Sequence, residues 1–393
     1  MFYLNLILII GIILIILTYL ILSLIPDKNY PKCKNNKHDF CVLVPARDES
    51  NVIEGLLLSI KNQSYNINLN DVYVIVEDEK DKTVEICKQY NVSVIVRKKL
   101  NLRTKGYALD EALKIILKKK KYDAYFIFDA DNVLDKDYFK NMISVYDKGY
   151  DIATGYRNTK NGDSSVVAAA SSLTFSLVNT LFNKSKCNKH KNITLSGTGF
   201  YIKGDIINKF KGFPFNSLTE DYEFTMYSIL NCYTTYYNEK SVFFDEQPVK
   251  YKDTINQRIR WIKGYFNVRK LYNKKLRKSL NRKDKNYFSK LSEIIGIYPI
   301  ILLLLYLVIY VFLSLLIYKK YIIIPILIAL TYFILFLITL FLVIKEKNKI
   351  KLSLKNKILV LFYNPIFMFT YVFCAIKAFT KKKVVWTKIK HGK

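Results

Sequence analysis

Residues 124–131 read Ala-Tyr-Phe-Ile-Phe-Asp-Ala-Asp, a short apolar run that ends in two carboxylates. Such a continuous run is typical of a strand that is buried on both faces of a parallel sheet. Ligands of these sheets bind beyond the carboxyl ends of the strands. Asp129 and Asp131 could therefore converge on a hard divalent cation that also takes phosphate oxygens. A solvated turn is the alternative explanation of these two acids.

The segments before this run repeat the same alternation. Strands are predicted at 40–44, 72–76 and 92–96, and helices are predicted at 51–63, 82–90 and 106–117. Strands that alternate with amphipathic helices form βαβ units, so the sequence predicts an α/β fold with a mostly parallel sheet. The second strand also ends in acid, at Asp78. Glu49 follows the first strand, where helix capping could equally explain it.

Three further motifs follow toward the C-terminus. They are Gly197-Thr198-Gly199, then Glu220-Asp221, and then Gln257, Arg260 and Trp261. The last three residues are spaced i, i+3, i+4, which places an amide, a guanidinium and an indole on one helix face. That face could bind a diphosphate and a sugar ring. It could also be the polar face of an amphipathic helix at a membrane surface.

Apolar and charged residues are separated along the chain, which is 51% apolar and 24% charged. We predict an N-terminal transmembrane anchor at 1–27, a cytoplasmic domain at 28–290, a transmembrane hairpin at 291–345, and a membrane-associated or re-entrant segment with a basic tail at 346–393. Residues 2–25 are too long an apolar run for a signal peptide and lack a basic segment before them. The apolar stretch 166–182 is predicted to be an interfacial helix of the domain.

Lysines near these segments predict the orientation, because positive charge stays on the cytoplasmic side. They follow the first anchor and the hairpin, so the domain is predicted to be cytoplasmic in a multi-pass protein of the cell membrane. A crossing of 358–379 would place the basic tail outside. The Asn364-Pro365 pair predicts a break there, which favours a re-entrant or interfacial segment.

The net charge of +30 comes mainly from lysine, since only nine of the 62 basic residues are Arg, and much of it is expected to be solvated surface. A nucleic-acid partner is not expected, because such binding needs a basic, aromatic groove free of membrane spans. The six cysteines form no C-x-x-C pair, so neither a zinc site nor a disulfide framework is indicated.

The ordered motifs together resemble the membrane-embedded branch of the inverting family-two glycosyltransferases. This branch includes cellulose, chitin, hyaluronan and poly-N-acetylglucosamine synthases. The resemblance covers residues 40–265 and rests on Val44-Pro45-x-x-x-Glu49, Asp78, Asp129-x-Asp131, Gly197-Thr198-Gly199, Thr219-Glu220-Asp221 and Gln257-x-x-Arg260-Trp261. It implies a GT-A fold with one N-terminal and two to three C-terminal transmembrane helices. It also implies a UDP-sugar donor and Mg²⁺ or Mn²⁺ as cofactor.

The resemblance implies a role for each motif. Asp131, assisted by Asp129, would hold the metal, and Asp221, beside Glu220, would be the general base. The nucleotide sugar would be bound by Ala46, Glu49, Asp78 and Lys105, with Asp129 and Asp131. The acceptor and diphosphate would be bound by Gly197, Thr198, Gly199, Gln257, Arg260 and Trp261. The run Glu77-Asp78-Glu79-Lys80-Asp81 is one residue shorter than the common pattern, which leaves Glu77 and Asp81 as alternatives to Asp78.

The expected activity is hexosyl transfer of the EC 2.4.1 type, from a UDP-sugar to a growing β-linked polysaccharide or to a lipid-linked acceptor. A complete Gln-x-x-Arg-Trp motif resembles that of processive synthases. Three or four membrane segments form a thin wall for a polymer channel. If the acceptor is a growing polysaccharide, an export or accessory subunit, or a homo-oligomer, is therefore expected. Membrane lipids are expected partners in either case. A non-catalytic scaffold or transport subunit is the remote alternative. The presence of every candidate catalytic carboxylate argues against it.

Overall fold

The structure is a computed structural model that describes residues 37–189, 191–296 and 323–381, together with Thr18, Ile21, Leu24, Ile25, Tyr306, Ile309 and Phe312. The predicted anchor at 1–27, the first arm of the hairpin beyond residue 296 and the tail beyond 381 lie outside the continuously described segments. The chain divides into two compact units. The first contains residues up to Asn161 together with Thr174–Gln247, and the second contains Gly162–Leu173 together with the described residues from Pro248 onward.

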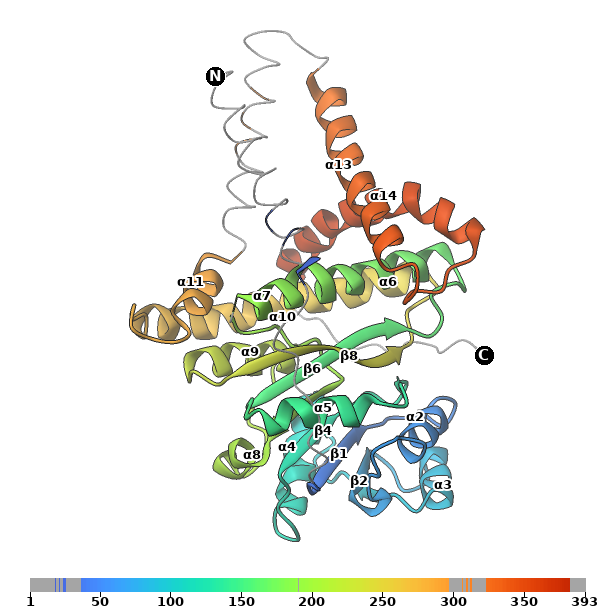
Figure 1. Ribbon diagram of the computed structural model, residues 1–393, viewed down its shortest axis with the longest axis vertical. Helices are drawn as coiled ribbons and strands as arrows, with labels where there is room; N and C mark the ends of the chain where they lie inside the picture. The colour runs from blue at the N-terminus through green and yellow to red at the C-terminus, as the bar shows by residue number, and fades with distance from the viewer. Residues whose placement is uncertain are drawn as a thin grey trace. The chain divides into compact units, whose positions relative to one another are not determined.

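The first unit contains a mixed sheet of eight strands in the order β3-β2-β1-β4-β7-β6-β8-β5 (Figure 1). The strands are β1 (Phe40–Pro45), β2 (Val72–Val76), β3 (Ser93–Val96), β4 (Ala124–Ile127), β5 (Val133–Leu134), β6 (Ile152–Thr159), β7 (Phe200–Lys203) and β8 (Thr235–Asp245). The pairs β1–β2, β1–β4 and β2–β3 are parallel, as the sequence predicts. The pair β6–β8 is also parallel, whereas β7 runs antiparallel to both β4 and β6.

Helices cover both faces of this sheet. One face packs against α2 (Ile53–Lys61), α3 (Lys82–Gln89) and α5 (Tyr138–Asp147). The other packs against α4 (Lys105–Ile116), α8 (Gly204–Phe210) and Phe224 of α9 (Glu220–Leu230). Alternate residues of β1 show the division, because Val42 and Val44 belong to the first layer and Cys41 and Leu43 to the second. Burial on both faces explains why the strands are apolar without alternation.

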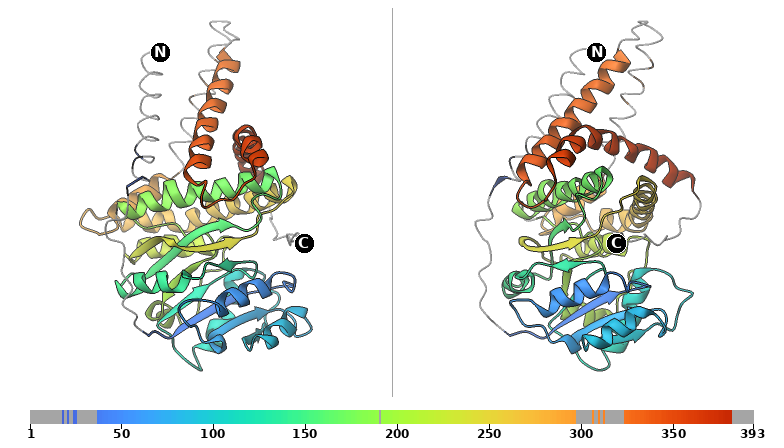
Figure 2. Two further views of the ribbon diagram at one scale, coloured as in Figure 1. Left: turned by 45° about the vertical axis from the view of Figure 1, so that its right-hand side comes forward. Right: turned by 90° about the vertical axis from the view of Figure 1, so that its right-hand side faces the viewer.

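The second unit is built around α10 (Tyr251–Lys278), α11 (Tyr287–Ile295), α13 (Ile323–Lys345) and α14 (Leu354–Thr380). Helix α14 packs against both α10 and α13. It continues unbroken through Pro365, so the break predicted at Asn364-Pro365 is wrong. The Asn364 amide instead donates a 2.9 Å hydrogen bond to the Thr339 hydroxyl of α13. Helix α14 runs at a steep angle to α13 (Figure 2).

Among the residues that the structure describes, three helical segments are long and apolar enough to cross a membrane, namely Val166–Asn188, Ile324–Lys345 and Leu354–Thr380. The first joins α6 (Val166–Leu177), a π-helical stretch (Val178–Asn183) and α7 (Lys184–Asn188). Two-thirds of its apolar window is buried inside the protein, against 11% for the second segment. Much of the apolar character of residues 166–182 therefore serves packing within the protein.

Candidate functional site

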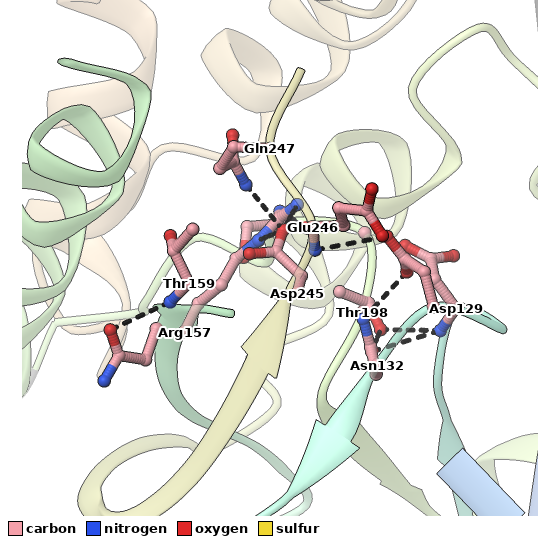
Figure 3. Close-up of polar contacts among 12 residues, drawn as sticks. Asp129, Asn132, Arg157, Thr159, Thr198, Asp245, Glu246 and Gln247 are labelled. Carbon is pink, nitrogen blue, oxygen red and sulfur yellow. Dashed lines mark hydrogen bonds and ion pairs between the residues drawn. The ribbon is translucent and has the colours of Figure 1, made fainter. Parts of the chain in front are cut away.

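The Asp129–Asp131 turn leaves the carboxyl end of β4 and is shaped by two buried polar side chains (Figure 3). The backbone N–H of Asp129 donates to the Thr198 hydroxyl at 2.8 Å and to the Asn132 side-chain oxygen at 3.2 Å. The Thr198 hydroxyl in turn donates to Asn132. Because Thr198 and Asn132 are fully buried, these bonds fix the turn.

The Asp131 carboxylate accepts a hydrogen bond at each of its oxygens. The Asn132 amide donates to Oδ1 at 3.1 Å, and the backbone N–H of Glu246 donates to Oδ2 at 3.3 Å. Glu246 directly follows β8, so the end of that strand helps to orient a carboxylate that comes from β4. The sequence prediction did not include Asn132 or Glu246.

Lys105 is the first residue of α4, and its ammonium group joins two of the predicted motifs. It donates to Asp129 Oδ1 and, at 2.7 Å, to the Gly197 carbonyl oxygen. The helix start is fixed in place, because a Cβ at Gly106 would lie 1.8 Å from the Phe215 carbonyl oxygen. Lys105 therefore contributes a positive charge between the metal motif and the Gly197 turn.

Asp221 lies in the first turn of α9, where the helix dipole favours acidic residues. A Cβ placed on Gly197 would lie 3.7 Å from Asp221 Oδ2, so the two residues are neighbours. Gly197 has φ +85°, which is the region that favours glycine. Asp129, Lys105, Gly197 and Asp221 are thus brought together, while Glu220 beside them is buried.

Gly199 has a different surrounding from Gly197. A Cβ at Gly199 would lie 2.1 Å from Cε1 of the Phe243 ring, so a side chain of this protein fills the space next to it. Its N–H donates to the Ile127 carbonyl at 2.9 Å, and its carbonyl accepts from Thr154 Oγ1 at 2.9 Å. Gly199 is therefore tightly packed within the sheet, and its predicted role at the acceptor stays a prediction.

Of the residues predicted to bind the nucleotide sugar, Ala46, Glu49 and Asp78 lie at the carboxyl ends of β1 and β2. Buried Ala46 continues the pairing of these strands through a 2.8 Å bond from its N–H to the Ile75 carbonyl. The N–H of Glu49 donates to the Thr83 hydroxyl at 3.1 Å, which ties the β1 loop to the first turn of α3. Asp78 follows β2 and is exposed.

Two alternatives to Asp78 have structural roles. Glu77 pairs with Arg47 at 3.0 Å and with Arg97 at 3.3 Å. Asp81 is the N-cap of α3, where it accepts from the Thr83 N–H at 2.8 Å, and its other oxygen accepts from the Asp48 N–H at 2.8 Å. Asp78 also accepts a hydrogen bond, from the Lys80 N–H to its Oδ1 at 2.9 Å, and its binding of the nucleotide stays a prediction.

Gln257, Arg260 and Trp261 lie on α10 of the second unit and are half-buried. The residue between them, Arg258, is fully buried. Its Nη1 donates to the Phe367 carbonyl at 3.1 Å and to Thr370 Oγ1 at 2.8 Å, and its guanidinium carbon lies 4.0 Å from the centre of the Phe367 ring. Arg258 therefore holds α14 against α10.

The sequence prediction also missed a buried ion pair between Arg157 of β6 and Asp245 at the end of β8. Arg157 Nε donates to Asp245 Oδ2 at 2.6 Å, and its Nη1 donates to the Ser196 carbonyl at 2.7 Å. Burial raises the pKa of the Asp245 carboxyl, and Arg157 opposes this shift. The sequence signal that could have identified Asp245 is the one used for Asp129, namely an acid that follows an apolar strand.

Asp129 and Asp131 are the residues that could hold a divalent metal. Within the described ranges, no group of three or more His, Cys, Asp or Glu side chains forms a complete metal site. Two carboxylates are nevertheless a common protein contribution to Mg²⁺ sites whose other ligands are substrate phosphates and water.

Comparison with known proteins gives the family. The family model described as "Glycosyltransferase like family 2" matches residues 38–264, more than half of the chain. The chain belongs to this glycosyltransferase family. The match begins before β1 and ends on α10, so it includes each motif described above.

Two curated proteins are similar to this family-two glycosyltransferase. "Probable glycosyltransferase YdaM" of Bacillus subtilis is 24% identical over 258 residues, which cover 61% of this chain and 58% of that protein. An uncharacterized protein of Methanocaldococcus jannaschii is 35% identical over 123 residues, covering 31% of this chain and 48% of that one. The matches thus span about half the length of each curated relative.

A solved structure shares the fold of this glycosyltransferase. The mannosyltransferase PcManGT from Pyrobaculum calidifontis, in complex with GDP-Man and Mn²⁺, superposes with a TM-score of 0.53 at 15% identity. The superposition covers 72% of this chain and 76% of that one. It supports a GT-A-like domain.

Proposed function

We propose that the protein is a membrane-bound inverting glycosyltransferase that moves a hexose or an N-acetylhexosamine from a UDP-sugar to a growing β-linked polysaccharide. The proposal rests on the proximity of four residues, namely Asp129, Lys105, Gly197 and Asp221. It puts groups suited to a diphosphate beside a carboxylate suited to receive a proton. The resemblance of these motifs to those of polysaccharide synthases supports the choice of donor and acceptor.

The donor would lie along the carboxyl ends of β1, β2 and β4. Ala46, Glu49 and Asp78 would bind the uridine. Asp129 and Asp131 would hold Mg²⁺ or Mn²⁺, and their oxygen donors fit these hard cations. When bound, the cation would stabilise the negative charge of the diphosphate leaving group.

Lys105 would act beside the cation on the same diphosphate. Its ammonium group already lies against Asp129 and the Gly197 carbonyl oxygen. A charge-assisted hydrogen bond from Lys105 to a phosphate oxygen would become stronger as negative charge builds up on the departing group.

Asp221 would be the general base. As the acceptor oxygen forms its bond to the anomeric carbon, Asp221 takes the proton of the acceptor hydroxyl. The bond from that carbon to the diphosphate oxygen breaks, and its electron pair leaves with UDP. Attack from the face opposite the diphosphate converts an α-linked donor into a β-linked product. Buried Glu220 would support Asp221 from the neighbouring position.

The acceptor site remains a prediction from the family pattern. Gln257, Arg260 and Trp261 would contribute an amide, a guanidinium and an indole to it, and Thr198 with Gly197 would contribute the turn beside Asp221. A lipid-linked acceptor is the second candidate, favoured by the small number of membrane segments predicted from the sequence, three or four. A polymer channel would then need an accessory subunit or a second copy of the chain.

We place the protein at the cell membrane on the basis of the apolar helices of the second unit. The lysine distribution of the sequence favours a catalytic domain on the cytoplasmic side. Helix α13 is almost entirely apolar and has the length needed to cross the hydrocarbon core. Because α14 lies at a steep angle to α13 and packs on α10, we propose that α14 lies along the membrane surface instead of crossing. The basic tail can then stay on the cytoplasmic side, as the lysine distribution predicts.

A donor panel tests the proposal. The full-length protein in lipid nanodiscs is incubated with radiolabelled UDP-glucose, UDP-N-acetylglucosamine or GDP-mannose, with Mn²⁺ or with EDTA. We expect incorporation from a UDP-sugar that stops in EDTA, with the label in material too large to extract into organic solvent. Extractable label would favour the lipid-linked acceptor, and incorporation from none of the donors would contradict the proposed function.

A further inference from the structure

Neither partner of the buried ion pair between Arg157 and Asp245 is among the site residues predicted from the sequence. Asp245 is 2% exposed, and its Oδ2 accepts from Arg157 Nε at 2.6 Å and from the Gln247 amide at 2.9 Å (Figure 3). Arg157 Nη2 makes a second contact with the same oxygen. The guanidinium also stacks on Phe175, with its carbon 3.8 Å from the ring centre. Both partners are therefore held in a single geometry.

Each partner connects to a different part of the site. Asp245 is the last residue of β8, and the next residue, Glu246, donates its backbone N–H to Asp131 Oδ2 at 3.3 Å. Arg157 Nη1 donates to the Ser196 carbonyl at 2.7 Å, directly before Gly197. The pair thus joins the end of β8, which orients Asp131, to the turn that lies beside Asp221.

Stability alone is a weak reason for this arrangement. Removing two charges from water costs as much as their attraction returns in many proteins, and apolar residues of similar volume often replace such pairs without loss. Moreover, Asp245 Oδ1 is buried and has no hydrogen-bond partner among the described residues, which adds to the cost. Apolar residues could not replace two contacts of this pair. These are the hydrogen bond from Arg157 to the Ser196 carbonyl and the link from Asp245 to Asp131 through the end of β8.

We propose that Arg157 and Asp245 are positioning residues that set Asp131 and the Gly197 turn in register, so that the metal-bound diphosphate and the base Asp221 face the same anomeric carbon. The inference rests on the proposed function and assigns a role to two residues outside the family motifs used above. Neither residue touches the donor. They act through the Glu246 N–H and the Ser196 carbonyl.

The test measures Mn²⁺ binding in the presence of UDP, because this readout does not need turnover. Full-length protein in detergent is titrated with Mn²⁺ at saturating UDP, and free Mn²⁺ is followed by electron paramagnetic resonance. We expect Asp245→Asn and Arg157→Lys to raise the apparent Kd for Mn²⁺ by about 10- to 100-fold, the usual effect of altering groups that orient a metal ligand. A lysine at position 157 cannot contact both Asp245 and the Ser196 carbonyl, so its positive charge alone should not restore the Mn²⁺ affinity.

Glu239→Gln is the matched control. Glu239 lies on the same strand, β8, and pairs with Lys184 at 2.8 Å, away from the contacts to Asp131 and Ser196. This variant should bind Mn²⁺ like the native protein. Circular dichroism melting shows which variants are folded. Should Asp245→Asn not fold, Gln247→Leu removes only the 2.9 Å bond to Asp245 and should still weaken Mn²⁺ binding.

The outcomes separate the two proposals. A native protein that binds no Mn²⁺ with UDP would contradict the proposed function itself. Native binding, together with folded Arg157→Lys and Gln247→Leu variants of unchanged Mn²⁺ affinity, would overturn the positioning role while leaving the function standing.

Discussion

Replacing Gly199 by alanine should destabilise the first unit far more than the same change at Gly197. Both glycines have positive φ, +65° and +85°, so each substitution carries a backbone penalty of about 1–2 kcal/mol. Only at Gly199 does the new Cβ meet a buried ring, 2.1 Å from Cε1 and 2.3 Å from Cζ of Phe243. Overpacking of this kind adds about 1–3 kcal/mol.

The backbone at Gly199 cannot move away from this clash. Hydrogen bonds to Ile127 and from Gly155 and Thr154 hold it between β4 and β6. At Gly197 the new methyl group would only contact Asp221 Oδ2, at 3.7 Å. We therefore expect Gly197→Ala to fold well and to lose activity, by about 10- to 100-fold in kcat/KM, through displacement of reacting groups.

Thermal melting of both variants, followed by circular dichroism, measures the difference. One kcal/mol shifts Tm by about 2–4 °C in a domain of this size, so Gly199→Ala should melt about 2–12 °C below Gly197→Ala. In a Phe243→Ala background, which lacks Cδ1, Cε1 and Cζ, most of that difference should disappear. Equal melting temperatures of the two alanine variants in the native background would refute the packing argument.

Three further predictions concern the first unit. Asp81→Ala should cost about 1 kcal/mol of stability through loss of the α3 N-cap, seen as a lower Tm. Burial raises the pKa of Cys87 to about 12, so at pH 8 its thiolate is scarce, and mass spectrometry should find iodoacetamide on exposed Cys232 well before Cys87 unless the pH is raised toward 12 or the protein unfolds. Lys105→Met should lower kcat/KM for the donor by about 10- to 100-fold with Tm retained, because one charge-assisted hydrogen bond contributes about 1.5–3 kcal/mol, and unchanged kinetics would remove Lys105 from the site.

The parallel half of the sheet was predictable from the sequence, and the other half was not. The strand predicted at 72–76 is β2 with the same bounds. Strands buried on both faces leave an apolar signal that survives without tertiary information. In contrast, β6 and β8 contain polar residues such as Arg157 and Glu239, and their register shifts between Gly155 and Tyr156. Their partners come from distant parts of the chain, which local patterns do not reveal.

The candidate site shows the same limit. The motifs located the acids at the strand ends, because a βαβ fold delivers those ends to one edge. They did not distinguish Gly197 from Gly199, since only the structure shows that Phe243 fills the space beside one of them. Likewise, Pro365 predicts a helix break by its missing N–H, yet packing of α14 on α10 and α13 keeps the helix continuous.

The rate of UDP release by native protein and by two matched aspartate variants tests the central claim most directly. Asp221 lies in the first turn of α9, and Asp205 lies, exposed, in the first turn of α8. With Mn²⁺, a UDP-sugar and acceptor membranes, Asp205→Asn should release UDP at the native rate. Asp221→Asn should lose at least about 100-fold, as expected for loss of a general base. Equal rates from folded Asp221→Asn and native protein would contradict the assignment of Asp221 as the base.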